Sequence, residues 1–172
     1  HPYAHSTIGS MEDLDAATVE DVHEWFRTYY GPSNAVLVLA GDITLAEARE
    51  KVTRYFADIA PGTPVSQPTS WVVRKAGTVR ERAYDRVAQP RLYRVWNVAD
   101  HASPDADRLT LLGQVLAEDK NSRLYQRLVI KERLATGVGA SLWGREIGGQ
   151  FLVTVDLKPD ADIERDQKNR HL

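Results

Sequence analysis

Apolar positions in the first part of the chain follow two different spacings. Over residues 16–30 they recur every three or four positions, which predicts a helix with one apolar face. Residues 35–40 are apolar without interruption, and so short a run favours a strand covered on both faces over a helix. The helical spacing returns over residues 44–58. Before the first helix, residues 1–14 are expected to form a loop with a tight turn at residues 8–10.

Polar and conformationally special residues mark the predicted ends of these helices. Asp15 is the expected N-cap of the first helix, because its carboxylate can accept an otherwise unpaired amide of the first turn. Gly31 and Pro32 end that helix, since proline blocks continuation. Thr44 and Glu47 form a capping-box pattern before the second helix. The predicted inward residues are Val19, Val22, Phe26 and Tyr29 in the first helix, and Leu45, Ala48, Val52, Tyr55 and Phe56 in the second.

Residues 61–70 carry three prolines and no periodic apolar pattern, which is typical of a semi-extended linker. The 172 residues have room for one ample domain or two small ones. The linker predicts two: a unit of residues 1–60 and a second unit of residues 71–172.

Four strands are predicted in the second unit, in two pairs. Residues 78–87 and 91–98 show weak alternation, whereas residues 135–143 and 150–157 alternate more clearly. In the last strand, one side is expected to hold Phe151, Val153, Val155 and Leu157.

Two helices are predicted between these pairs of strands. The first begins at Ser103, followed by Pro104, whose ring is pre-shaped for the first helical turn. The second covers residues 122–133. A polar tail over residues 159–172 is predicted to stop inside a further helix. The expected inward residues are Leu109, Leu112 and Leu116 in the first helix, and Leu124 and Leu128 in the second.

Composition removes several classes of function. The net charge is −2 and the pI about 6.2, so nothing in the overall balance indicates a nucleic-acid or membrane partner. There is no cysteine, which excludes disulfides, thiolate nucleophiles and Cys-ligated zinc. This fits the cytosol and the bacterial periplasm equally, so the compartment stays open. No apolar run approaches the roughly 20 residues of a membrane span.

Three histidines are considered as candidate metal ligands. His1 and His5 have the spacing that places two imidazoles on one helix face, but Pro2 and the turn after it argue against a helix there. His23 is followed by Glu24 without a second histidine one turn later, so we interpret this pair as part of a solvated helix face.

Other polar groups have simpler structural interpretations. The acidic residues from Glu12 to Asp21 complement a helix N-terminus. Residues 144–149 contain three glycines but join two strands, so a hairpin connection is expected instead of a phosphate-binding loop. Ser122 and Ser141 have no base nearby in sequence and give no support to serine catalysis. The four tryptophans are expected to be core or interface anchors: Trp25, Trp71, Trp96 and Trp143.

Several segments, taken in order, resemble the insulinase/pitrilysin family of zinc metallopeptidases. His1-Pro2-Tyr3 and Thr7-Ile8-Gly9 open the chain. Residues 30–42 read Tyr-Gly-Pro-Ser-Asn-Ala-Val-Leu-Val-Leu-Ala-Gly-Asp, and residues 122–129 read Ser-Arg-Leu-Tyr-Gln-Arg-Leu-Val. The resemblance covers nearly the whole chain.

The resemblance implies an α+β fold of the mitochondrial processing peptidase-like metallohydrolase type. In that family each half of the molecule holds two similar domains, each with a sheet packed against helices, and the two halves close around a peptide. Residues 1–60 would be the end of the first, metal-bearing domain, and residues 71–172 most of the second. The implied partners are a peptide or unfolded protein and the other half of the clamshell.

The family's catalytic signatures are missing from this sequence. Its zinc motif, His-x-x-Glu-His with a distal Glu, supplies two metal-binding imidazoles and a Glu that activates water. In family order the motif would precede His1, so the resemblance implies zinc in the parent protein and no catalytic or metal-ligating residue in this chain. An Arg and a Tyr that orient substrate in the opposite half correspond here to Val129 and Thr136, which cannot do that work.

The sequence therefore predicts an inactive fragment of a zinc endopeptidase. Two alternatives stay open: a non-catalytic structural or partner subunit of the same fold, and a stand-alone α+β module that binds a partner through a sheet edge. On the first interpretation, residues 1–60 lack strands that would cover them, so self-association or partial disorder is expected.

Overall fold

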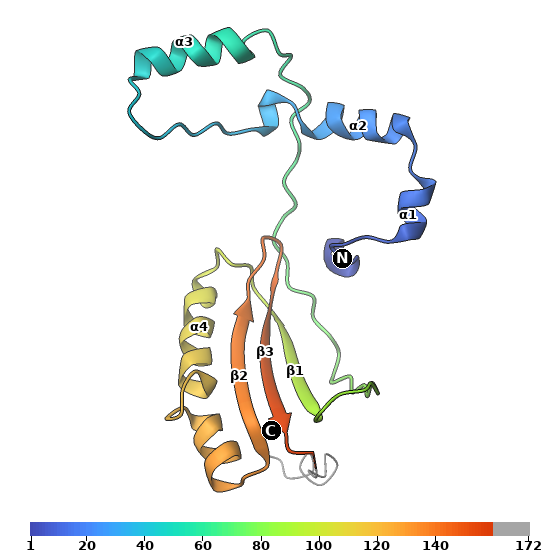
Figure 1. Cartoon of the computed structure of the whole chain (residues 1–172), viewed down its shortest axis with the longest axis vertical. Helices are drawn as coiled ribbons and strands as arrows, with labels where there is room; N and C mark the ends of the chain where they lie inside the picture. The colour runs from blue at the N-terminus through green and yellow to red at the C-terminus, as the bar shows by residue number, and fades with distance from the viewer. Residues whose placement is uncertain (160–172) are drawn as a thin grey trace. The chain divides into compact units, whose positions relative to one another are not determined.

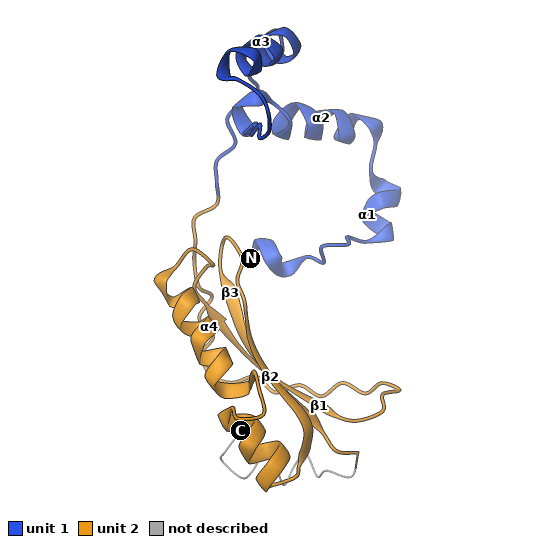
Figure 2. Cartoon of the chain, turned by 60° about the vertical axis from the view of Figure 1, so that its left-hand side comes forward, with its two compact units in different colours: residues 1–67 blue, residues 68–172 orange. Residues whose placement is uncertain are grey.

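The computed structural model describes residues 1–159 and divides the chain into two compact units, residues 1–67 and residues 68–172 (Figures 1 and 2). The division falls inside the segment 61–70 that the sequence predicts as a linker. The helix predicted at the end of the chain lies outside the described residues.

Unit 1, residues 1–67, is built from helices. Its longer elements are α2 (Val19–Tyr29) and α3 (Leu45–Phe56), both predicted from the apolar spacing. A shorter helix, α1 (Met11–Ala16), and two 3-10 turns, η1 (Pro2–Ala4) and η2 (Pro32–Asn34), complete it. The prediction of a loop before the first long helix was therefore incomplete.

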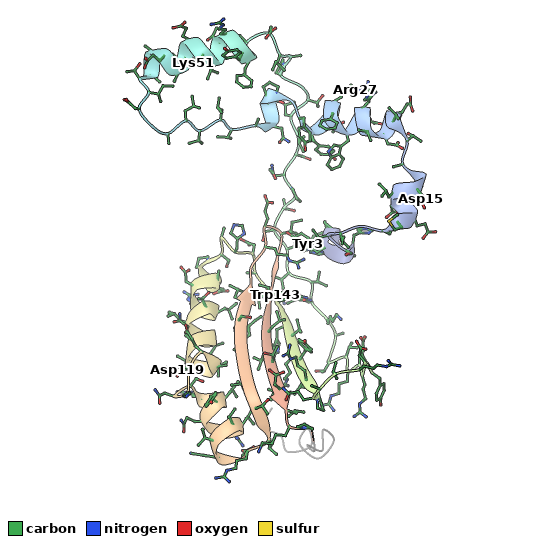
Figure 3. All side chains as sticks on the ribbon, in the orientation of Figure 1. Tyr3, Asp15, Arg27, Lys51, Asp119 and Trp143 are labelled. Carbon is green, nitrogen blue, oxygen red and sulfur yellow. The ribbon has the colours of Figure 1, made fainter. Side chains whose placement is uncertain are left out.

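The start of α2 is set by a different cap from the predicted one. Asp15 lies within α1, as Figure 3 shows, so it does not cap α2. The N-cap is Thr18, whose hydroxyl accepts the backbone N–H of Asp21 at 3.2 Å while the Asp21 carboxylate accepts the Thr18 backbone N–H at 2.8 Å. The capping box predicted at Thr44 and Glu47 is confirmed, with reciprocal distances of 2.9 and 3.3 Å.

The predicted strand over residues 35–40 does not form. The segment is extended, but within the described residues it pairs with no other strand, and Val36 is 92% exposed. Most inward residues predicted for α2 and α3 are exposed, Ala48 and Val52 are partly buried, and no residue of unit 1 is fully buried. An isolated extended segment has no ladder hydrogen bonds to hold it, so apolar patterning alone does not make a strand.

Unit 2 contains a three-stranded antiparallel sheet in the order β1-β3-β2. Its strands are β1 (Arg91–Val98), β2 (Ala135–Trp143) and β3 (Gly149–Leu157). They match the strands predicted at 91–98, 135–143 and 150–157. The strand predicted over residues 78–87 does not form, because this charged segment has no neighbouring strand to pair with.

Helix α4 (Pro104–Ala117) packs on the sheet against β2 (Figure 1). Ser103 caps it and Pro104 occupies the first turn, as predicted. Close approach depends on Gly113, where an added Cβ would lie 2.8 Å from the Ala140 carbonyl oxygen. This sets the inward face one position away from the predicted Leu112, which is 43% exposed. The buried residues of α4 are Ala106, Gly113 and Ala117.

The second predicted helix is present but wound differently. Residues Tyr125–Lys131 form a π-helical segment, η3, in which the Glu132 N–H bonds to the Arg127 carbonyl five residues back. Leu128 on this segment is 2% exposed, confirming its predicted inward position. It forms a core with Ala135, Val155 and Leu157, against which the following residues pack: Leu92, Leu124, Val129 and Val138.

Candidate functional site

The two N-terminal histidines do not share a helix face. His1 Nδ1 accepts the backbone N–H of Tyr3 at 3.1 Å as the cap of η1, and His5 follows that short turn in an extended conformation. His23 and Glu24 are both exposed on α2. Across residues 1–159, no group of three or more His, Cys, Asp or Glu side chains is arranged to hold a metal ion.

The acidic residues near α1 and α2 serve the helix starts. Glu12 and Asp13 occupy the first turn of α1, which Ser10 caps. Asp21 accepts both the hydroxyl and the backbone N–H of Thr18. The Thr18 hydroxyl bond is the main reason that the pKa of the Asp21 carboxyl is lowered from its ordinary value. These carboxylates stabilise helix ends and form no acid/base pair.

Residues 144–148 form the predicted hairpin connection between β2 and β3, and Gly149 begins β3. A Cβ at Gly148 would lie 2.7 Å from the Trp71 carbonyl oxygen, so the segment entering unit 2 passes directly against the turn. Ser122 is buried and donates its hydroxyl to the Asp119 carbonyl oxygen at 2.6 Å. That bond gives Ser122 a role in the turn before η3 and not in catalysis.

Thr136 lies in an irregularity of β2 that the sequence did not predict. Ala135 pairs with Leu157 and Gly137 with Asp156, so Thr136 is the extra residue of a β-bulge. The other residue at a family site position, Val129, is partly buried and packs against the core around Leu128.

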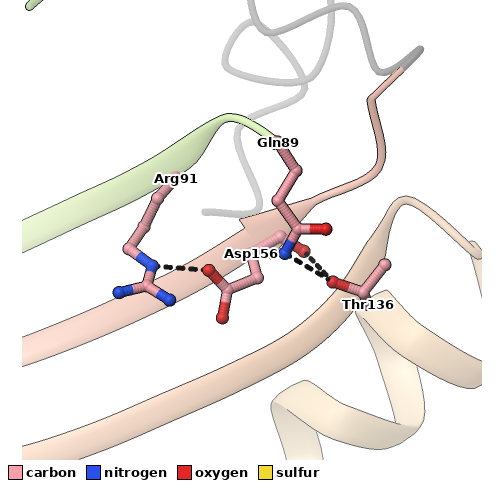
Figure 4. A network of polar contacts seen from close by, with 4 residues as sticks. All are labelled: Gln89, Arg91, Thr136 and Asp156. Atoms are coloured by element: carbon pink, nitrogen blue, oxygen red, sulfur yellow. Dashed lines mark hydrogen bonds and ion pairs between the residues drawn. The ribbon is translucent and has the colours of Figure 1, made fainter. Parts of the chain in front are cut away.

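The bulge brings Thr136 into a polar network at one end of the sheet (Figure 4). Gln89 Nε2 donates to Thr136 Oγ1 at 3.0 Å, and Thr136 Oγ1 donates to the Asp156 carbonyl oxygen at 3.3 Å. The Arg91 guanidinium pairs with the Asp156 carboxylate, Nε to Oδ1, at 2.5 Å. This pairing is the main cause that raises the pKa of Arg91 above its ordinary value, so the guanidinium stays charged.

This network has a structural role and not a catalytic one. The Thr136 hydroxyl bonds to an amide and a backbone carbonyl, so no carboxylate or imidazole is placed to take its proton. Gln89 and Arg91 lie 47 and 65 residues from the partners they contact, so no local sequence pattern could have indicated the group. The network ties the beginning of β1, the bulge of β2 and the end of β3 together.

The rings predicted as anchors are half-exposed. Trp25 contacts Tyr29 with ring centroids 4.3 Å apart, and Trp96 contacts Phe151 at 6.2 Å. All four tryptophans are 45–55% exposed, so the core part of the prediction of core or interface anchors is wrong, and their role as interface anchors stays a prediction. No helix of residues 1–159 is long and apolar enough to cross a membrane.

Comparison with known proteins finds peptidase relatives in both a family model and a curated protein. Residues 16–167 match the family model described as "Peptidase M16 inactive domain". A curated relative, the zinc protease PqqE of Helicobacter pylori, is 25% identical over 98% of this chain. The chain spans 38% of that relative's length.

Two solved structures share the fold. A crystal structure of a protease from Helicobacter pylori covers 98% of this chain with a TM-score of 0.64 and 27% identity. A peptidase M16 inactive domain from Pseudomonas fluorescens covers 92% with a TM-score of 0.69 and 22% identity. This chain spans 41% and 38% of those two chains.

Proposed function

Because this chain belongs to the family of the peptidase M16 inactive domain, we propose that it is the non-catalytic part of a zinc-dependent endopeptidase. The family assignment confirms the resemblance to insulinase/pitrilysin-type peptidases and the α+β fold class. The parent protein would hydrolyse peptides or unfolded proteins inside a chamber closed by two halves. Assigning residues 1–60 and 71–172 to two successive domains of the zinc-bearing half is part of the same proposal.

The donor set of the described residues does not fit zinc. A zinc site needs three or four His, Cys, Asp or Glu ligands around one point, and residues 1–159 bring no such group together. Zinc would belong to another part of the parent; the relative from Helicobacter pylori is a zinc protease, and this chain spans 38% of its length. No catalytic step is therefore assigned to side chains of this chain.

Unit 2 supports a role as a wall of the proposed chamber. Its sheet is covered by α4 and η3 on one face, and β1 and β2 are its edge strands among the described residues. An extended peptide can add to such an edge through main-chain hydrogen bonds. This favours a part that holds and encloses a peptide over one that cleaves it.

A non-catalytic subunit of the same fold is the second candidate. It is compatible with Val129 and Thr136, which stand where the half opposite the zinc-bearing one carries an Arg and a Tyr in the family; the missing pair fits a zinc-bearing half and a non-catalytic subunit alike. Val129 packs against the core, and the Thr136 hydroxyl is already hydrogen-bonded to Gln89 and to the Asp156 carbonyl oxygen.

The proposal is tested by zinc-dependent peptide hydrolysis. The chain of residues 1–172, given excess zinc and a quenched-fluorescence peptide library, is expected to show no turnover above the peptide blank. The full-length parent, assayed beside it, is expected to cleave and to lose activity with a chelator. Zinc-dependent turnover by the chain alone would refute the assignment, and a folded but inactive parent would favour the non-catalytic subunit.

A further inference from the structure

Positive charge is concentrated in the segment that enters and begins β1. Residues 74–94 hold seven basic and two acidic side chains, a net charge of +5 in a chain whose overall net charge is −2. All nine are exposed. The basic residues are Arg74, Lys75, Arg80, Arg82, Arg86, Arg91 and Arg94, and the acidic ones are Glu81 and Asp85. The near-neutral balance of the whole chain conceals this local excess.

The ends of this segment are fixed to the sheet of unit 2. Asn97 Nδ2 donates to the Val73 carbonyl oxygen at 3.0 Å, and the Leu157 N–H donates to the Pro90 carbonyl oxygen at 2.9 Å. Between these anchors the loop projects away from the sheet beside β1 (Figures 1 and 2). The basic side chains of the loop are therefore presented to solvent on a tethered support.

Arg91 is paired with Asp156, whereas four other basic side chains of the segment form no ion pair within residues 1–159. The Asp85 carboxylate accepts the backbone N–H of Arg86 at 2.7 Å, and the exposed Arg86 guanidinium forms no ion pair with residues 1–159. Arg74, Lys75 and Arg80 also form no ion pair with any residue from 1 to 159. Exposed like charges gathered on one loop repel each other and attract an anionic partner.

The composition of the surface indicates which kind of anion. Apolar and aromatic side chains alternate with the charges, with Val79 63%, Tyr84 85% and Val87 66% exposed. Arginine and tyrosine together are typical of protein–protein contacts. Glu81 and Asp85 among the basic residues disfavour a partner with evenly spaced phosphates, since they would repel it. The mixture fits an acidic polypeptide that also carries apolar side chains.

We propose that residues 74–94, the basic loop surface, bind an acidic polypeptide segment through Arg74, Lys75, Arg80 and Arg86, with Tyr84 in apolar contact. The surface lies apart from the Thr136 network, except that Arg91 belongs to both. The proposal does not depend on the parent being a peptidase.

Binding is measured by fluorescence anisotropy with the whole 172-residue chain and a labelled peptide rich in Glu, Ala and Leu. Arg80→Glu/Arg86→Glu is expected to weaken binding about tenfold, because each exposed ion pair contributes roughly a two- to fivefold change. Affinity should also fall as salt rises, since the Debye length shrinks from about 10 Å at 0.1 M to about 3 Å at 1 M.

The matched control is Arg49→Glu/Lys51→Glu on α3, which makes the same change in net charge outside the surface. It is expected to change affinity by less than about twofold, the scale of a single exposed ion pair. Circular dichroism and urea unfolding check that all variants fold. If the charge reversal unfolds the chain, Arg80→Gln/Arg86→Gln replaces it, with a smaller loss of affinity expected.

Three outcomes would overturn the proposal. The first is equal binding of the Glu-rich peptide and a Lys-rich counterpart. The second is tighter binding of duplex DNA or phosphatidylserine vesicles than of the acidic peptide at the same salt, which would make the partner a phosphate polymer or a lipid surface. The third is equal loss of affinity in the α3 control.

Discussion

At the scale of single residues, a few side chains hold the elements of unit 2 together. Leu128 is 2% exposed in contact with Ala135, Val155 and Leu157, so it joins η3 to two strands. Thr136 owes its contacts to a bulge and not to any local pattern. Leu128 was predictable from helical spacing, whereas Thr136 was not, because the bulge exists only once β2 is paired with β3.

Leu128→Ala is expected to destabilise unit 2 by about 2–5 kcal/mol, since a buried leucine leaves a cavity when truncated. The free energy of unfolding is measured by urea denaturation. Ile130→Ala is the control, because Ile130 lies on the same segment and is 49% exposed. It should cost well under half as much, and equal losses would contradict the assigned core.

At the scale of elements, helices were predicted better from the sequence than strands. The helices α2, α3 and α4 were predicted, because their spacing and most of their caps are written in neighbouring residues. The predictions of strands over residues 35–40 and 78–87 were wrong, because a strand needs a partner strand, and no local pattern guarantees one. The predicted regular helix at 122–133 is wound as a π-helical segment whose inward residue was still right.

The capping box of α2 makes its helicity sensitive to acid. The folded-state pKa of Asp21 is lowered, so its contribution is complete above the ordinary carboxyl pKa of about 3.9 and is lost as pH falls through the lowered value. Asp21→Asn should reduce the helical NMR chemical shifts of α2 at pH 7 and remove their loss in acid.

Glu20→Gln is the matched control for that experiment, because it removes a first-turn charge without touching the cap. It should keep the acid transition of α2. An unchanged transition in Asp21→Asn would show that the Thr18–Asp21 box does not hold this helix end.

At the scale of the whole molecule, the two units differ in how much they bury. Unit 2 has a core beneath α4 and η3, whereas no residue of unit 1 is buried. Trp25, Phe26 and Leu37 of unit 1 are each about half exposed or more. Apolar surface of this extent marks an interaction site or a liability to associate.

We expect the chain to self-associate or to lose order in unit 1. Sedimentation velocity should show a concentration-dependent rise in the sedimentation coefficient, and Trp25→Ser/Phe26→Ser should reduce it. Leu111→Ser, at a 62% exposed position of unit 2 outside the basic loop surface, is the control and should leave association unchanged. A well-ordered monomer over the whole concentration range would contradict this expectation.

The sequence by itself determined the family resemblance, the helices with their apolar spacing, and the three strands that pair. These features could be predicted because apolar spacing, helix caps and turns each depend on residues that are close together in the chain. Only the tertiary structure decided which apolar faces are covered, where β2 bulges, and that Gln89, Arg91, Thr136 and Asp156 meet. Those outcomes depend on pairing and burial between distant segments, and burial requires a neighbour as well as an apolar side chain.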